Sequence, residues 1–555
     1  MKTFTLCLLT ACAWGAFAQT ATPLPVRAGD AAGERLGAVS FSVSCSPAEQ
    51  ASFDRGVALL HDFWYAEAQP QFERIAKADP NCAMAHWGIA MSIFHQIWDR
   101  PDENTMKLGR AEIQKAQSPA AQTEREGDYI AALAAFYEPD DPDYMARVTA
   151  YSTAMGKLYS KYPQDVDAGA FYALALLASD APNDTSLTHE HAAMEVLTPL
   201  FARYPDNPGV VHYIIHACDN PSMAAEGLAA AERYGEIAPS GPHAVHMAGH
   251  IFARLGMWPQ DITAQIGSIE ASEAAEARHD SGIMDEPHSY DFLMYAYLQS
   301  GQDAKAKAVL TQSAAAVDRI AAMPGMGGGY MAGMAEYYRI KFPVFYALEM
   351  RDWQAAAALE PVPGAQPSDA AMTWWARAIG DGHLHRAKQA HTDLARFDAL
   401  MAEQRKGRNA YVAESTGAQI ERGEIQAWAS FAADQRDAAE REMRAAADLQ
   451  DKVGQGEVDI PAREMLGDML LAWQEPQQAL AEYRVALKLS PNRLNGLYNA
   501  GVAAEAAGDK AAAVEYFSVL LKSTDNGENS ARPELAHAKS MLAANSATAA
   551  GAGAL

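Results

Sequence analysis

The sequence predicts an all-α protein folded as an α-solenoid, a right-handed superhelix of helical hairpins. Small, aromatic and proline residues recur with a period of 34 residues, which is the length of a two-helix repeat. No alternating apolar and polar run of the kind typical of a β-strand stands out. The chain has 555 residues, of which 49% are hydrophobic and 21% are charged, so it is long enough for several domains or for one extended array of repeats.

The first residues have the features of an export signal rather than of a folded element. They read MKTFTLCLLTACAWGAFAQT, with a basic start, a short apolar run and a small-x-small pattern at residues 16–18, so we predict a signal peptide over residues 1–18. The run LTAC at residues 9–12 also resembles a lipoprotein box, in which Cys12 would carry the lipid. The mature chain is expected to be periplasmic or secreted, and to begin with a flexible segment over residues 19–44. No later stretch approaches the ~20 apolar residues of a membrane-spanning helix.

The cysteines fit an oxidising compartment. Cys7 and Cys12 fall in the leader, which leaves Cys45, Cys82 and Cys218 and therefore at least one free thiol or an intermolecular bond. Cys45 and Cys82 bracket one predicted helical hairpin, so we expect them to form a disulfide. Two unpaired buried thiols are the alternative.

The clearest repeats lie near the C-terminus. In PAREMLGDMLLAWQEPQQALAEYRVALKLSPN, Gly467 and Tyr483 occupy positions 8 and 24 of the tetratricopeptide (TPR) pattern, and Gly501 and Phe517 follow 34 residues later. The small residue lets the two helices of a hairpin approach closely, the aromatic ring fills the gap, and a proline ends the second helix.

The same pattern extends through the rest of the chain. It predicts units at 49–82, 208–241 and from 242 onward, a further unit around 297–306 after an insertion of about ten residues, and weaker hairpins at 334–359, 370–390 and 417–449. The stretches 139–142 and 179–188 are expected to interrupt the array, and the glycine-rich run 323–329 is a possible hinge. We therefore predict one array over residues 45–320, a second over 330–540, and a disordered tail over 541–555.

Histidines recur on one face of two consecutive repeats. The first helix of a TPR hairpin turns positions 2, 5, 9, 12 and 13 toward the concave groove. Positions 5 and 9 are histidine in both repeats, 34 residues apart; the second repeat adds a histidine at position 2 and the first an aspartate at position 12. The candidate metal ligands are His212, His216, Asp219, His243, His246 and His250.

This arrangement suits a transition metal. Residues at i and i+4 lie on one helix face, and helices packed about 8–10 Å apart can bring imidazoles from both to one ion. One or two ions of Zn, Cu, Ni or Fe would fit imidazole and carboxylate ligands. Further candidates on the groove are His61, His95, His288, Asp291 and Arg254.

Four pieces of the chain resemble a family of secreted bacterial TPR proteins of unknown role. They are FDRGVALLHDFWYAEAQPQFERIAKADPNCAMAHWGIAM, HYIIHACDNP, APSGPHAVHMAGHIFARLGMW and PAREMLGDMLLAWQEPQQAL. The family pattern is HYxxHxxDxP followed by HxxHxxxH, carried here by His212, Tyr213, His216, Asp219, Pro221, His243, His246 and His250. Cys218 and Asn220 depart from the commoner residues, which puts the loop after that helix in doubt. The resemblance implies the repeat fold and export, and it implies no known reaction.

Two functions of different classes follow. The first is a groove that binds a transition metal, either as a metal-binding protein or as a metalloenzyme in which Asp219 acts as a base or ligand and Arg254 holds an anionic substrate. The alternative is a periplasmic scaffold whose groove clasps a protein or peptide partner without a metal. A net charge of −26 repels phosphate backbones and argues against nucleic acid as a partner. Catalysis stays open, because no known catalytic motif is present.

Overall fold

The prediction of an all-α repeat fold is confirmed. The computed structural model describes residues 33–97, 100–118, 123–138, 143–180, 184–281, 285–321, 330–407 and 410–552, without the side chains of 330–333 and 546–552. These residues form twenty-five α-helices and three short 3-10 helices, and they contain no β-strand. Within this part of the chain, no helix has the length and apolar character needed to cross a membrane.

The N-terminal array consists of five hairpins preceded by the 3-10 helix η1 (Pro47–Glu49). Its helices are α1 (Gln50–His61), α2 (Tyr65–Ala78), α3 (Ala83–Ser92), α4 (Glu103–Gln117), α5 (Glu124–Tyr137), α6 (Tyr144–Lys161), α7 (Val166–Ala178), α8 (Thr188–Arg203), α9 (Pro208–Cys218) and α10 (Ala224–Ile237). The array curls back on itself, because α9 packs against α1 as well as against α7. The expected interruption at 139–142 lies outside the described residues, as do residues 181–183 of the one at 179–188. Helix α5 packs against α6, and α7 packs against α8, so the array continues past both stretches.

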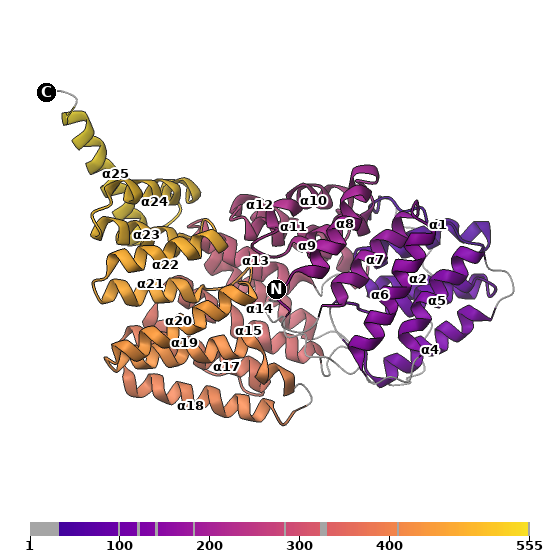
Figure 1. Cartoon of the computed structure of the whole chain (residues 1–555), viewed down its shortest axis with the longest axis horizontal. Helices are drawn as coiled ribbons and strands as arrows, with labels where there is room; N and C mark the ends of the chain where they lie inside the picture. The colour runs from indigo at the N-terminus through magenta and orange to yellow at the C-terminus, as the bar shows by residue number, and fades with distance from the viewer. Residues whose placement is uncertain are drawn as a thin grey trace.

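A central hairpin and a C-terminal array follow (Figure 1). The central hairpin is α11 (Pro242–Arg254) and α12 (Trp258–Ala277). The C-terminal array comprises α13 (Glu286–Gln299), α14 (Asp303–Ala321), α15 (Tyr330–Glu349), α16 (Trp353–Ala357), α17 (Pro367–His383), α18 (Ala387–Gln404), η3 (Ala410–Glu414), α19 (Thr416–Ala432), α20 (Arg436–Val453), α21 (Ala462–Ala472), α22 (Pro476–Leu489), α23 (Leu494–Ala506), α24 (Lys510–Ser523), η4 (Asp525–Gly527) and α25 (Pro533–Ala552). It also curls back, since α23 contacts α13.

The first helices of the hairpins form the inner layer. Odd-numbered helices pack against one another in three runs, from α1 to α5, from α7 to α19 and from α21 to α25, and α9, α11 and α13 are consecutive members of the second run. The TPR packing rule explains the close approach within a hairpin. A Cβ atom on Gly467 would lie 2.6 Å from the ring of Tyr483, so glycine at position 8 is what admits the aromatic residue at position 24.

The predicted boundary between the two arrays differs from the observed one. One hydrophobic core ends within α11 and α12, and the second begins there and includes α13 and α14. The cores therefore meet at the central hairpin instead of at the glycine-rich run, of which residues 323–329 lie outside the described residues. Local composition marks a glycine-rich connection, but it does not show which helices share a core.

The segments predicted to be flexible at 19–44 and disordered at 541–555 are more ordered than predicted where the structure describes them. Residues 33–44, part of the segment expected to be flexible, lie along the N-terminal array: Phe41 is fully buried, and its ring contacts those of Phe53 and Trp87. At the other end α25 continues to Ala552, into the tail predicted to be disordered, and residues 553–555 lie outside the described residues. Residues 33–44 belong to no repeat, so the 34-residue pattern of the sequence does not show that they are buried.

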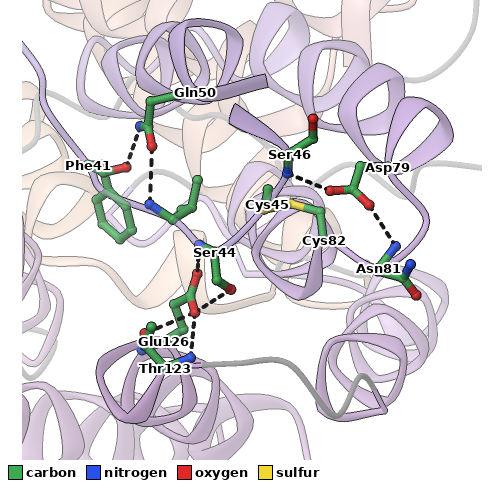
Figure 2. Close-up of a disulfide and its surroundings, with 11 residues drawn as sticks. Phe41, Ser44, Cys45, Ser46, Gln50, Asp79, Asn81, Cys82, Thr123 and Glu126 are labelled. Carbon is green, nitrogen blue, oxygen red and sulfur yellow. Dashed lines mark hydrogen bonds between the residues drawn. A yellow bond between two sulfur atoms is a disulfide. The ribbon is translucent and has the colours of Figure 1, made fainter. Parts of the chain in front are cut away.

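A disulfide joins Cys45 to Cys82 and encloses the first hairpin (Figure 2). The chain beside it is held by hydrogen bonds: Ser44 donates from its backbone N–H and its hydroxyl to Glu126, at 2.6 Å and 2.7 Å, and the backbone N–H of Ser46 donates to Asp79 at 2.7 Å. Residues preceding α1 are thus tied both to the connection between α2 and α3 and to α5. Cys218, the third cysteine of the described residues, is buried with a free thiol.

Candidate metal centre

The histidine stripe forms two groups of three side chains on the inner helix layer. Triad A consists of His212 and His216 of α9 with His243 of α11, and triad B consists of His246 and His250 of α11 with His288 of α13. Within each triad one ring nitrogen per histidine lies within 4.8 Å of the others. Each triad thus combines positions 5 and 9 of one repeat with position 2 of the next.

In triad B, hydrogen bonds fix the orientation of two rings. The Nδ1 atom of His246 lies 2.7 Å from Oε1 of Gln265, and Nδ1 of His250 lies 3.0 Å from Oδ2 of Asp219 and 3.3 Å from Oε1 of Glu457. These oxygens can only accept, so both Nδ1 atoms carry the hydrogen. The two Nε2 atoms, 2.9 Å apart, therefore face one another with ligand-type lone pairs when the rings are neutral.

The three histidines of triad B differ in the direction in which their pKa values are shifted. Burial lowers the pKa of His246 and of His288 well below the usual range, and neighbouring histidines add to this, so both rings are neutral at pH 7. Burial also disfavours a charged His250, but the carboxylates of Asp219 and Glu457 outweigh it and raise its pKa to about 10. Without a metal, the Nε2–H group of a protonated His250 would donate a hydrogen bond to Nε2 of His246.

Triad A has the same construction. The Nε2 atoms of His212 and His216 lie 3.0 Å apart, and Nδ1 of His212 donates to the backbone carbonyl of His61 at 2.6 Å. Burial, with the charges of His216 and His243, lowers the pKa of His212 well below the usual range. The ring of Phe63 packs against all three imidazoles, with centroid distances of 4.4, 5.4 and 5.8 Å.

Two polar side chains behind His246 occupy positions that TPR hairpins normally fill with alanine and an aromatic residue. Asp261 and Gln265 stand at positions 20 and 24 of their repeat. Gln265 accepts a hydrogen bond from His246 and donates one from Nε2 to Asp261 at 2.9 Å. His246 of α11 is thus connected by hydrogen bonds to two side chains of α12. Sequence reasoning missed both residues, although the polar replacement of two packing positions is a signal that could have found them.

The predicted roles of Asp219 and Arg254 change in the structure. Arg254 donates from Nε to Asp219 at 2.9 Å, from Nη2 to the Asp219 carbonyl, and from Nη1 to the carbonyl of Gln455, and its Nη2 also lies 3.2 Å from Glu457. Its donors are committed to the protein, so it does not point at a substrate. Asp219 contacts His250 from the side opposite to His246, so it is not a third ligand of that ring pair. With His250 and Glu457 it forms a separate group of possible ligand atoms that lie within 4.8 Å of one another.

Of the other predicted groove residues, only His288 joins a triad. The ring of His61 is buried between Tyr213 and Asp167, at 2.9 Å and 3.1 Å from its two nitrogens. The ring of His95 stacks on Tyr65 and belongs to neither triad. Asp291, expected at position 5, forms a buried ion pair with Lys341.

The protonation of Asp261 can be tested through the pH dependence of the protein's stability. It is fully buried, its Oδ2 atom has no hydrogen-bond partner among the described residues, and burial raises its pKa to about 8. The folded protein thus holds a proton that the unfolded chain, with a pKa of about 3.9, releases. The stability associated with this proton is complete below about pH 4 and is lost as the pH rises through about 8.

The variant Asp261→Asn removes this proton and keeps the side-chain size. The free energy of unfolding of the variant minus that of wild type should be higher at about pH 9 than at about pH 5, by several kcal/mol. The reason is that wild type loses stability over this range, and one pKa unit corresponds to about 1.4 kcal/mol. Urea unfolding of both proteins at the two pH values measures the difference. Parallel pH profiles for the two proteins would contradict a neutral Asp261.

No protein-family model matches the chain, and the comparison with curated proteins found no match. Among solved structures, the chain is similar to human IFIT1, solved as a dimer with m7Gppp-AAAA, with a TM-score of 0.34 and 12% identity over 79% of this chain and 90% of that chain. It is also similar to a structure of Naa15/Naa10 bound to HypK-THB, with a TM-score of 0.24 and 11% identity over 90% of this chain and 91% of that chain. At these TM-scores neither similarity bears on function.

Proposed function

We propose that this chain is a metal-binding protein that holds a transition-metal ion in triad B, with His246, His250 and His288 as ligands. One observation carries the proposal. The Nε2 atoms of His246 and His250 lie 2.9 Å apart while both Nδ1 atoms are turned to oxygen acceptors.

The spacing of the ring nitrogens supports an ion between them. Two ligands at about 2.0–2.1 Å from a tetrahedral ion are about 3.3 Å apart, close to the separation of this pair. Two buried lone pairs that face each other repel unless a cation lies between them, and a metal ion would take the place of the proton on His250. Three histidines leave a fourth position for water or another ligand, and Zn, Cu, Ni and Fe are the metals that imidazole ligands suit.

The positioning residues also support a metal site. Histidine ligands usually donate their second ring N–H to a carboxylate, an amide or a carbonyl, which fixes the tautomer and makes the ring a better ligand. Gln265 has this role for His246, and Asp219 with Glu457 has it for His250. Glu457 belongs to the loop before α21, so the C-terminal array contributes to the site.

The second candidate function is a scaffold that clasps a protein or peptide partner, which is a common use of a TPR-like fold. Only the fold favours it. A peptide lying along the histidine stripe would have to displace Phe63 from triad A and Glu457 from triad B, since His212 and His246 are fully buried. We therefore place metal binding first.

We also propose that the chain works outside the cytoplasm. The predicted signal peptide over residues 1–18 supports this location, and so does the disulfide between Cys45 and Cys82, which persists in oxidising compartments. Expression with the leader followed by cell fractionation tests the location. Retention of uncleaved chain in the cytoplasm would contradict it.

The metal proposal is tested on the mature chain purified without a histidine tag. Metal content is measured by mass spectrometry before and after incubation with Zn, Cu, Ni and Fe salts and removal of excess metal. We expect stoichiometric metal in the wild type and the loss of one equivalent per chain in His246→Ala/His250→Ala. His279→Ala/His391→Ala is the matched control, because both of its histidines are exposed, and it should retain all the metal.

Far-UV circular dichroism of each variant checks its helix content. If the double variant does not fold, the milder change His288→Gln at a partly exposed ligand should still weaken binding. A wild-type chain that stays metal-free after all four incubations would overturn the proposal. If that chain also captured a peptide through His246 and His250, the scaffold would take its place.

A further inference from the structure

Triad A repeats the geometry of triad B one structural repeat earlier in the chain. His212 and His216 precede His246 and His250 by 34 residues, and the third members, His243 and His288, both stand at position 2 of the following repeat. The helices α9, α11 and α13 contact one another in that order. The two triads are thus copies related by the step of the solenoid.

The copies agree in their chemistry. The paired Nε2 atoms are 3.0 Å apart in triad A and 2.9 Å apart in triad B. In each triad the Nδ1–H group of the first ring of the pair donates a hydrogen bond that orients the ring, to the His61 carbonyl in triad A and to Oε1 of Gln265 in triad B. A phenylalanine packs on each set of imidazoles, Phe63 in triad A and Phe292 in triad B.

Negative charge near triad A favours a cation there. Oδ1 of Asp285 lies 3.5 Å from Nδ1 of His243. Asp62, which stands between His61 and Phe63 in the chain, is fully buried; it accepts a hydrogen bond from Tyr234, and its Oδ2 atom has no hydrogen-bond partner among the described residues. Burial raises the pKa of Asp62 well above its usual range, so Asp285 is the carboxylate that supplies negative charge at this triad.

The triads lie close together. The ring centroids of His243 and His246, one from each triad, are 6.1 Å apart. An ion bound at about 2.0 Å from a ring nitrogen lies about 3 Å from the centre of that ring, so ions in the two triads would be no more than about 13 Å apart.

We propose that the chain holds two divalent transition-metal ions side by side, the second in triad A with His212, His216 and His243 as ligands. The proposal rests on the function proposed for triad B and extends it to a two-ion centre. Each ion has three imidazole ligands and one further coordination position. The 34-residue repeat, which places one triad, places the other as well.

Copper(II) loading of the untagged mature chain tests the pair. We expect two equivalents of copper per chain, and a low-temperature EPR spectrum broadened by dipolar coupling between two nearby Cu(II) ions. His212→Ala/His216→Ala should bind one equivalent and give the sharp spectrum of an isolated ion, and so should His246→Ala/His250→Ala. His279→Ala/His391→Ala is the control and should match the wild type.

The outcomes separate this inference from the proposed function. One equivalent of copper, lost in His246→Ala/His250→Ala and unchanged in His212→Ala/His216→Ala, overturns the two-ion centre and leaves metal binding by triad B intact. Two equivalents without dipolar broadening place the second ion elsewhere and also overturn it. No bound copper overturns both. The wild-type stoichiometry and spectrum decide the matter even if a variant does not fold.

Discussion

Replacement of Arg493 by alanine is expected to lower the free energy of unfolding by about 3–5 kcal/mol, the usual cost of removing one partner from a buried ion pair. Arg493 stands immediately before α23, and its side chain is 1% exposed. It donates to Glu349 at 2.9 Å and to Glu464 at 2.8 Å, and also to the hydroxyl of Tyr295 and, at 2.8 Å, to the carbonyl of Asp459. The variant would leave two carboxylates buried without their cation.

The physical reason for the large effect is the position of this guanidinium in the fold. Tyr295, Glu349 and Glu464 belong to α13, α15 and α21, so one side chain closes the C-terminal array where α23 returns to α13. Urea unfolding followed by far-UV circular dichroism measures the loss. Arg484→Ala is the matched control, because that side chain is 52% exposed and lies 3.6 Å from Asp509, and it should change stability by less than about 1 kcal/mol. Equal losses in the two variants would contradict this role for Arg493.

Replacement of Gly249 by alanine is expected to weaken metal binding at triad B by about 10–100-fold, the usual effect of disturbing a residue that orients a metal ligand. A Cβ atom on Gly249 would lie 1.9 Å from Nε2 of Gln265 and 2.6 Å from Oδ1 of Asp261. Gln265 would have to move, and His246 would lose the acceptor that holds its Nδ1–H.

Competition with a chromophoric chelator of known affinity measures this change in the metal-loaded chain. Gly235→Ala, in the neighbouring helix α10, is the matched control, since a Cβ atom there meets nothing closer than 4.0 Å. If both glycine variants bind metal with wild-type affinity, Gln265 does not control His246. If both variants lose affinity equally, the loss comes from a general disturbance of helix packing and not from the orientation of His246.

The two arrays meet at the proposed site. Glu457 and Gln455, from the loop before α21, contact His250 and Arg254 of α11. The indole N–H of Trp258, at the start of α12, donates to the carbonyl of Asn492 at 2.8 Å. Metal binding at triad B is therefore expected to depend on the docking of the C-terminal array, which supplies one of the two carboxylates behind His250.

Much of the fold could be predicted because its signals are local. Glycine at position 8 and an aromatic residue at position 24 meet within one hairpin, as Gly467 and Tyr483 do, so their spacing alone reveals the contact. Residues 33–44 and the core boundary at α11 and α12 could not be predicted, because they depend on burial between elements that are far apart in the sequence.

The candidate site divides in the same way. The placement of histidines at positions 2, 5 and 9 on one helix face could be predicted, because 3.6 residues per turn and a 34-residue period are local properties of the chain. Contacts between repeats are what group these histidines into two triads, add His288 to the second, and commit Arg254 to Asp219. These contacts join different repeats, and the one between His250 and Glu457 spans 207 residues, so spacing within a single repeat does not reveal them.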